Sequence, residues 1–186
     1  MTAPPPAEFK IVFTGPMGAG KTTAIATISD EVPVSTDVAN SDRGTVDKAS
    51  TTAGLDYGCI AIDDDTSIRL YGTPGQVRFK FMWEILSHSA AGVIVLIDAA
   101  QADAVVQLEY FVDAFGSGKK VPLVVGIGRT QQPGALPLDV FTSRLENHGL
   151  TLPVFGVDVR QRPDVLLLID TLLCLLEAPD SARLNA

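Results

Sequence analysis

The chain has few residues of the kinds that build disulfides, metal centres or nucleophilic sites. Its 186 residues include 2 cysteines and 2 histidines. Neither Cys59 nor Cys174 has a second cysteine or a histidine at metal-ligand spacing. We therefore expect both thiols to be small buried apolar side chains, in a protein of the reducing cytoplasm.

Positive charge is also sparse. The chain has 14 Lys and Arg against 22 Asp and Glu, for a formal net charge of −8. No basic run is longer than Lys119-Lys120. Because a surface for DNA or RNA needs clustered basic side chains, we expect no nucleic-acid partner.

Long apolar runs and targeting signals are missing as well. The longest apolar runs, residues 90–97 and 165–169, are far shorter than the roughly 18 residues that cross a bilayer. Residues 1–6 lack the basic start and apolar centre of a signal peptide. We expect a soluble, cytoplasmic protein with no membrane span.

The strongest positive signal is a phosphate-binding loop of the pattern G-x-x-x-x-G-K-[ST]. It reads Gly15, Pro16, Met17, Gly18, Ala19, Gly20, Lys21 and Thr22. A predicted strand (Phe9–Thr14) precedes it and a predicted helix (Thr22–Ser29) follows, as the motif requires. Glycines let successive N–H groups point at a phosphate, and the helix adds its positive N-terminus. We assign phosphate binding to residues 15–22 and Thr23, with Lys21 on the β and γ phosphates and the Thr22 hydroxyl on Mg²⁺.

Two apolar runs later in the chain flank a short acidic turn. Leu55–Ile62 and Ser67–Gly72 are separated by too few residues for a crossover, which predicts an antiparallel hairpin. If the hairpin turns about Asp64, facing residues have numbers that sum to 128. Asp56 then lies opposite Gly72, at the end nearest the phosphate loop.

Beyond the hairpin, apolar strands alternate with helices, which predicts an α/β fold. We expect one domain over residues 9–178, with tails at 1–8 and 179–186, and a six-stranded, mostly parallel sheet with one antiparallel strand and helices on both faces. The remaining strands are expected at Gly92–Asp98, Pro122–Gly128 and Pro153–Val157, and the helices at Phe79–His88, Asp103–Phe115, Leu138–Asn147 and Asp164–Glu177. This is the organisation of a P-loop NTPase.

Two further segments resemble the switch regions of Ras-like small GTPases. Thr51-Thr52-Ala53-Gly54-Leu55 resembles the Arf-type first switch, and Tyr71–Phe79, with Thr-Pro-Gly-Gln, resembles the second. Within that superfamily the chain looks most similar to bacterial MglA-like GTPases and to those paired with roadblock-domain proteins. The resemblance implies a Ras-like G domain that binds GTP, GDP and Mg²⁺ as a molecular switch with slow hydrolysis. It also implies an activator or exchange factor, a roadblock-domain protein among the candidates, and an effector that binds the triphosphate state.

The same resemblance assigns roles in the two switch loops. Thr52, with Thr51 as the alternative, would close onto Mg²⁺, and the Gly75 N–H would meet the γ-phosphate. Gln76 would orient the attacking water, with Lys21 stabilising charge.

An arginine from a switch loop could add further charge stabilisation. Arg43 is the first candidate and Arg78 the second, although a solvated loop arginine is the competing interpretation of each. Met17 stands at a phosphate-loop position that is commonly glycine in Ras, and we expect its bulk to slow hydrolysis.

Besides Met17, the chain departs from the Ras-like pattern at two places. Gly72 replaces the aspartate that holds Mg²⁺ through water, and we assign that role to Asp56 across the hairpin, with an exposed strand aspartate as the alternative. The base-reading motif N-K-x-D is replaced by residues 128–131, Gly-Arg-Thr-Gln. We assign base binding to Gly128, Arg129, Asp158 and Val159. Whether Asp158 accepts guanine or is an ordinary loop aspartate stays open.

Two alternative functions accompany these assignments, and the role of the last helix is open between two interpretations. The eroded motifs also fit a nucleotide-binding scaffold without turnover, and the phosphate loop resembles that of small-metabolite kinases, although the residues around 102–118 lack the arginines of a kinase lid. The last helix is apolar on nearly all sides, which fits either deep burial or a homodimer or partner contact.

Overall fold

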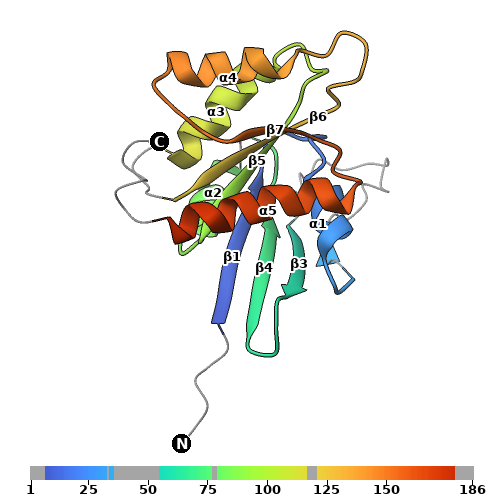
Figure 1. The fold of residues 1–186 in the computed structure, drawn as a ribbon, viewed down its shortest axis with the longest axis vertical. Coiled ribbons are helices and arrows are strands. Elements are labelled where there is room, and N and C mark those ends of the chain that lie inside the picture. Colours follow the sequence, from blue (N-terminus) through green and yellow to red (C-terminus); the bar gives the residue numbers. More distant parts are fainter. Residues whose placement is uncertain (1–6, 33, 36–54, 77–78, 117–120, 179–186) are drawn as a thin grey trace, which may run out of the picture.

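The protein folds as one sheet with helices packed on both sides (Figure 1). The computed structural model describes residues 7–32, 34–35, 55–76, 79–116 and 121–178. Within these residues the sheet has seven strands in the order β2-β3-β4-β1-β5-β6-β7. The strands are β1 (Ala7–Thr14), β2 (Val34–Ser35), β3 (Asp56–Ala61), β4 (Thr66–Gly72), β5 (Gly92–Asp98), β6 (Leu123–Gly128) and β7 (Val154–Val157). The helices are α1 (Lys21–Ile28), α2 (Lys80–Ser87), α3 (Ala104–Gly116), α4 (Leu138–Asn147) and α5 (Arg162–Glu177).

The sheet confirms the predicted fold class. All neighbouring strands pair in parallel except at β3, which runs antiparallel to β4 and to β2. The six predicted strands are present. The additional strand, β2, has only two residues, which is too short to show a periodic pattern in the sequence. β5 is buried along its whole length, as expected for a central strand of a parallel sheet covered on both faces.

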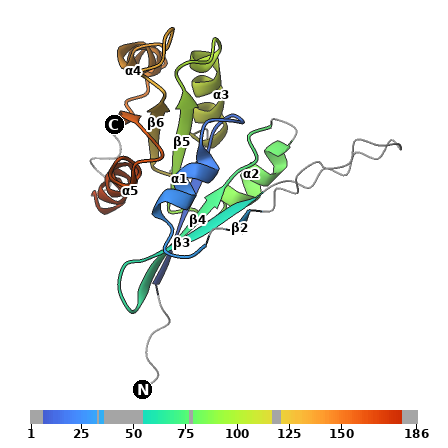
Figure 2. The ribbon, with the colours of Figure 1, turned by 90° about the vertical axis from the view of Figure 1, so that its right-hand side faces the viewer.

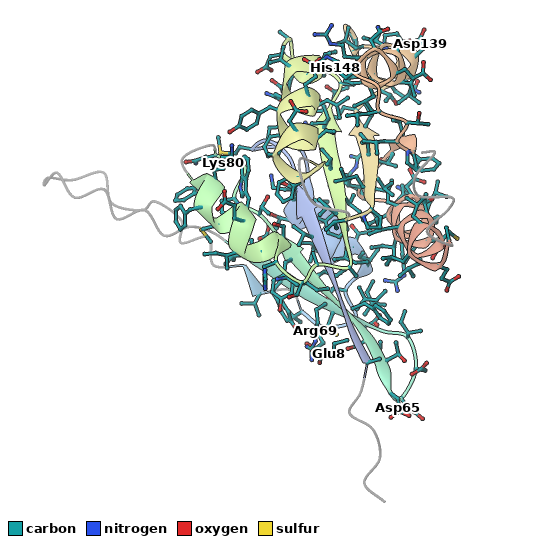
Figure 3. All side chains as sticks on the ribbon, turned by 90° about the vertical axis from the view of Figure 1, so that its left-hand side faces the viewer. Glu8, Asp65, Arg69, Lys80, Asp139 and His148 are labelled. Atoms are coloured by element: carbon teal, nitrogen blue, oxygen red, sulfur yellow. The ribbon has the colours of Figure 1, made fainter. Side chains whose placement is uncertain are left out.

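The hairpin has the predicted register. Asp56 pairs with Gly72, and the numbers of all facing residues sum to 128. Asp65 lies at the tip of the hairpin, which extends beyond the helical layers (Figure 3). β1 begins at Ala7, two residues before the predicted strand, because the Ala7 N–H donates to the Asp65 carbonyl and the strand pairs alongside β4.

The helices divide into two layers, which are seen edge-on in Figure 2. On one face, α1 and α5 pack together over the central strands, with Ile25, Leu168 and Leu172 in the core. On the other face, α2, α3 and α4 contribute Trp83, Phe111 and Phe141. Burial of these apolar side chains is the main source of stability, at roughly 1.5–3 kcal/mol for each large residue. Trp83 is among the largest of these buried side chains.

Helix α5 buries one stripe and exposes another. Val165, Leu168, Ile169 and Leu172 are buried against the sheet. The opposite stripe is exposed and includes Leu167 and Cys174. The expectation that both thiols are buried is therefore confirmed for Cys59 and wrong for Cys174, because an apolar sequence on all sides of a helix does not show which side faces the sheet. No helix in the described part of the chain combines the length and apolarity that a membrane crossing needs.

Candidate nucleotide-binding site

The phosphate loop connects the end of β1 to the start of α1. Gly15, Gly18 and Gly20 all have positive φ, at 135°, 84° and 94°. A Cβ on Gly15 would lie 2.0 Å from the Leu96 carbonyl oxygen on the neighbouring strand. Only glycine fits there, because the position needs both the left-handed backbone and the close approach to β5. The loop's shape is therefore fixed by glycines that the sequence motif already identifies.

The Lys21 side chain lies within this loop. Its ammonium donates hydrogen bonds to the carbonyls of Gly15 at 2.8 Å and Pro16 at 2.7 Å, and the residue is buried. These bonds hold the positive charge at the N-terminal end of α1, where the helix dipole is also positive. A phosphate entering the loop would meet both charges together.

The hydroxyl of Thr22 reaches across to the hairpin. It donates to Asp56 Oδ2 at 2.5 Å, and Asp56 is buried. A Cβ on Gly72 would lie 2.9 Å from Asp56 Cβ and 3.0 Å from Asp56 Oδ2. The absence of a side chain at Gly72 thus makes room for the Asp56 carboxylate beside the phosphate loop.

These two oxygen donors fit a magnesium ion. Mg²⁺ prefers one or two protein oxygens and completes its shell with waters and substrate phosphates. Thr22 and Asp56 offer a hydroxyl and a carboxylate at the phosphate end of the loop. Among the described residues, no cluster of three or more His, Cys, Asp or Glu side chains is arranged to hold a metal, so a dedicated all-protein cage is not seen there.

The loop after β4 packs directly on the phosphate loop. The hydroxyls of Thr73 and Thr14 lie 2.9 Å apart, and both residues are buried. A Cβ on Gly75 would lie 2.4 Å from the Met17 nitrogen, so the two backbones are in contact at this point. The Gln76 amide approaches the Met17 sulfur at 3.8 Å. The predicted Gly75 and Gln76 therefore lie beside the phosphate loop.

The side chain of Trp83, on helix α2, holds the loop after β4, which we call the second loop. Its indole N–H donates to the Pro74 carbonyl at 2.8 Å, and its ring packs against Phe111 and Phe115. Pro74 is the residue before Gly75. The indole thus joins the second loop to helix α2 and the core beneath it.

A pocket of about 540 Å³ lies between the phosphate loop and the segments that follow β6 and β7. It lies where β5, β6 and β7 end, the edge at which parallel α/β sheets bind ligands. Its lining includes Ala19 and Gly20 from the phosphate loop and Thr23 from the start of α1. It also includes all four residues predicted to bind the base, Gly128, Arg129, Asp158 and Val159. Three of the predicted phosphate-binding residues and all four predicted base-binding residues therefore line one pocket.

Arg129 links the pocket to the phosphate loop. Its guanidinium donates to the Gly18 carbonyl at 3.2 Å and pairs closely with Asp98, which is buried. Burial would raise the pKa of Asp98, but hydrogen bonds from Gln101, the Ala100 N–H and Arg129 outweigh it and hold that pKa below its usual value.

Sequence reasoning missed Asp98. The available signal was a carboxylate at the end of the fully apolar strand Gly92–Asp98, next to the strand that ends before Arg129. Parallel strands bring such terminal residues to the same edge of the sheet.

Asp158 is held by its neighbours in the loop after β7. Its two carboxylate oxygens accept hydrogen bonds from Arg160 Nε at 2.8 Å and Nη2 at 2.7 Å. Its own N–H donates to Asp164 Oδ2 at 2.8 Å. The side-chain and backbone hydrogen bonds from Arg160 lower the pKa of Asp158 to about 2. Asp158 is therefore ionised throughout the physiological range.

Two of the predicted site residues lie outside the described residues. These are Thr52, assigned to the metal, and Arg43, assigned to catalysis. Their alternatives Thr51 and Arg78 lie outside them too.

Comparison with known proteins agrees with a nucleotide site. An uncharacterized protein of the archaeon Methanocaldococcus jannaschii is 29% identical over 123 residues, which cover 66% of this chain and 71% of that protein. Residues 28–127, from the end of α1 into β6, match a family described as conserved hypothetical ATP binding protein. Because this match covers more than half of its length, the chain belongs to this family.

Proposed function

We propose that the chain is a nucleotide-dependent molecular switch that binds GTP and GDP with Mg²⁺ and hydrolyses GTP slowly. The observation that supports this most is the contact between Gly75 and the backbone of the phosphate loop at Pro16 and Met17. A static phosphate binder needs no second loop at this place. A switch needs one, because a γ-phosphate can be sensed only by a group that lies beside it.

Each described residue has a distinct task in this proposal. Lys21 stabilises the β and γ phosphates, and Thr22 with Asp56 would hold Mg²⁺. The ion, when bound, neutralises charge on the phosphate oxygens. The Gly75 N–H donates to the γ-phosphate, and Gln76 positions a water for in-line attack. Thr52 and Arg43 would complete the site from the first switch loop.

The second loop also connects the site to an outer surface. Because Trp83 holds the Pro74 carbonyl, a displacement of Gly75 is transmitted to α2. The outward side of α2 exposes Phe81 and Ile85, one helical turn apart. We propose that an effector, and a regulator of the roadblock type, recognise this helix. The MglA-like identity and the need for an activator are part of the same proposal.

The fluorescence of Trp83 provides the test. It is the sole tryptophan of the chain, so the emission comes from this one indole, whose N–H donates to the Pro74 carbonyl of the second loop. We expect the emission of protein saturated with GDP and Mg²⁺ to differ from that with a non-hydrolysable GTP analogue and Mg²⁺. Lys21→Ala, which removes the phosphate contact, should abolish the difference. Identical spectra from the two saturated states would contradict the switch.

A nucleotide-binding scaffold without turnover is the second candidate. It is favoured by Gln76, whose amide approaches the exposed Met17 sulfur instead of a polar partner in the loop. Phosphate release over several hours separates the two functions. A switch should release phosphate at a rate that Gln76→Ala lowers about tenfold or more, since positioning the nucleophile is a main part of phosphoryl transfer. A scaffold should show equal background rates in both proteins.

A further inference from the structure

We propose that Asp158 is the base reader of the pocket and selects guanine over adenine, and that Arg160 occupies this reader until a guanine base displaces it. This inference rests on the proposed function, because it assumes that a purine nucleotide places its phosphates on the loop at Gly15–Thr22. It adds what decides the base and what competes with it.

The geometry places both residues at the pocket. Asp158 and Arg160 line it together with Gly128 and Arg129. The Arg160 side chain is 77% exposed, whereas that of Asp158 is 37% exposed. The arginine can therefore leave toward solvent at little cost in packing. The carboxylate stays, because the Asp158 N–H is fixed to Asp164 on helix α5.

The hydrogen-bond pattern of the pair is the pattern that guanine presents. Arg160 directs two N–H groups on neighbouring nitrogens at the two oxygens of Asp158. Guanine directs its N1–H and its exocyclic amine in the same parallel way, because that edge of the base is itself a guanidine fragment. A carboxylate that accepts this fork from arginine can accept it from guanine. Adenine cannot supply it, since its N1 is an acceptor.

The other carboxylates at the pocket are already engaged within the fold. Asp98 accepts from Ala100, Gln101 and Arg129. Asp164 accepts the Asp158 N–H. Asp158 is ionised at neutral pH, with its pKa lowered to about 2 by Arg160, so it offers acceptors and no donor. An acceptor-only group rejects a base that lacks paired donors.

The experiment measures equilibrium affinities for GDP, ADP and xanthosine diphosphate with Mg²⁺. We expect the wild-type protein to bind GDP more tightly than ADP. Arg160→Ala should tighten GDP about two- to fivefold, the range for releasing one exposed ion pair, and leave ADP unchanged. Asp158→Asn should weaken GDP about tenfold or more, because one of the two accepted hydrogen bonds is lost.

The asparagine variant carries a second readout that misfolding cannot imitate. Xanthine has a carbonyl where guanine has its exocyclic amine, so it pairs with one donor and one acceptor. The side-chain amide introduced by the substitution would offer both. Asp158→Asn should therefore bind xanthosine diphosphate more tightly than GDP, reversing the wild-type preference. Arg144→Ala serves as the matched control, because it removes an arginine that pairs with Glu109 on the surface of α3 and α4. It should change none of these affinities.

The outcomes separate this inference from the proposed function. A preference for ADP, an equal effect of Arg160→Ala on GDP and ADP, or no gain in xanthosine diphosphate binding by Asp158→Asn would each overturn the assignment of the base reader. The difference in Trp83 emission between the GDP-bound and the GTP-analogue-bound protein tests the switch independently of base selection. A protein that binds none of the three nucleotides would overturn both proposals.

Discussion

The two ends of the nucleotide site differ in whether backbone or side chains form them. The phosphate end is mostly backbone: three glycines with positive φ, the N-terminal end of α1, and the Lys21 ammonium held by two carbonyls. The base end is mostly side chains, the pairs Asp98–Arg129 and Asp158–Arg160. Backbone geometry admits few substitutions, whereas side-chain pairs can be exchanged. The phosphate end thus keeps its motif while the base end departs from it.

The same contrast explains which functions each end can specify. Backbone N–H groups bind any phosphate, whatever base is attached. Discrimination between bases needs side chains whose donors and acceptors match one edge of the base. A protein can therefore keep nucleotide binding while its base preference changes. The predictions below test this division, beginning with the largest expected effect.

Gly15→Ala should break the phosphate end at its most constrained point. The added Cβ would lie 2.0 Å from the Leu96 carbonyl, on a backbone with φ of 135°. Since neither β5 nor the loop can move away without losing core packing, we expect the free energy of unfolding to fall by about 3–5 kcal/mol. Urea denaturation measures this loss.

Gly134→Ala is the matched control for this change. Gly134 also has positive φ, at 83°, but an added Cβ would meet no atom within 4 Å. The substitution should therefore cost about 1–2 kcal/mol, the penalty of a left-handed backbone alone. Equal losses at Gly15 and Gly134 would show that the contact with β5 contributes nothing.

Exchanging the residues at positions 56 and 72 tests where the phosphate end does depend on a side chain. Asp56→Gly removes the carboxylate, and Gly72→Asp forces a second one against it, since the new Cβ would lie 2.9 Å from Asp56 Cβ. We expect each single change to weaken Mg²⁺-dependent GDP binding about 10- to 100-fold. The double variant Asp56→Gly with Gly72→Asp should recover part of this loss, because one carboxylate again faces Thr22 without a clash.

A double-mutant cycle measures that recovery. We expect a coupling free energy of about 1–2 kcal/mol between the two positions, as for residues in contact. GDP titrations with and without EDTA separate the metal-dependent part. If the effects of the two single changes simply add, a carboxylate at position 72 does not replace the one at position 56, and the proposed exchange is wrong.

Much of the fold and of the phosphate end could be predicted from local rules. The loop Gly15–Thr22 follows from its glycines, and the pairing of Asp56 with Gly72 follows from the short turn at Asp63–Asp65. Alternation of apolar runs identified the strands and helices to within a few residues. These features are set by residues that lie close together in the chain, so their sequence pattern is enough to predict them.

The base end could be predicted only as a set of candidate residues. Arg129 adopts a φ of 58°, which is uncommon for a residue with a side chain, and it pairs with Asp98 from another strand. Asp158 pairs with Arg160, although the charge pattern alone equally allowed either side chain to be solvated. Such pairings depend on side-chain directions at the ends of three separate strands, and periodicity carries no information about them.

Arg129→Ala should loosen the connection between the two ends. The guanidinium joins the buried Asp98 to the Gly18 carbonyl of the phosphate loop. Because Arg129 is 45% exposed, solvent screens the pair, and we expect a loss of about 1 kcal/mol in stability and a roughly three- to tenfold weaker affinity for GDP and ADP alike. Urea denaturation and nucleotide titration measure the two effects.

Arg129→Lys is the comparison for that change. Lysine keeps the positive charge but cannot fork between a carboxylate and a carbonyl, so it should restore part of the stability and less of the affinity. A loss for GDP alone would assign Arg129 to base reading and would weaken the division between the two ends.

The smallest expected effect is a change in how Asp158 titrates. Its pKa is about 2 because the Arg160 side chain and N–H donate to the carboxylate, and Arg160→Ala should raise it toward the usual value of about 3.9. Since the folded pKa lies below the unfolded one, this pair contributes stability above about pH 4 and loses it as the pH falls toward 2. Carboxyl-carbon NMR of the two proteins measures the shift, with Glu109 as the internal reference because its pKa is lowered by Arg144 instead. Bound GDP should abolish the difference between the two proteins, because the guanine edge would then donate to Asp158 in both; a difference that persists with GDP bound would place the base elsewhere in the pocket.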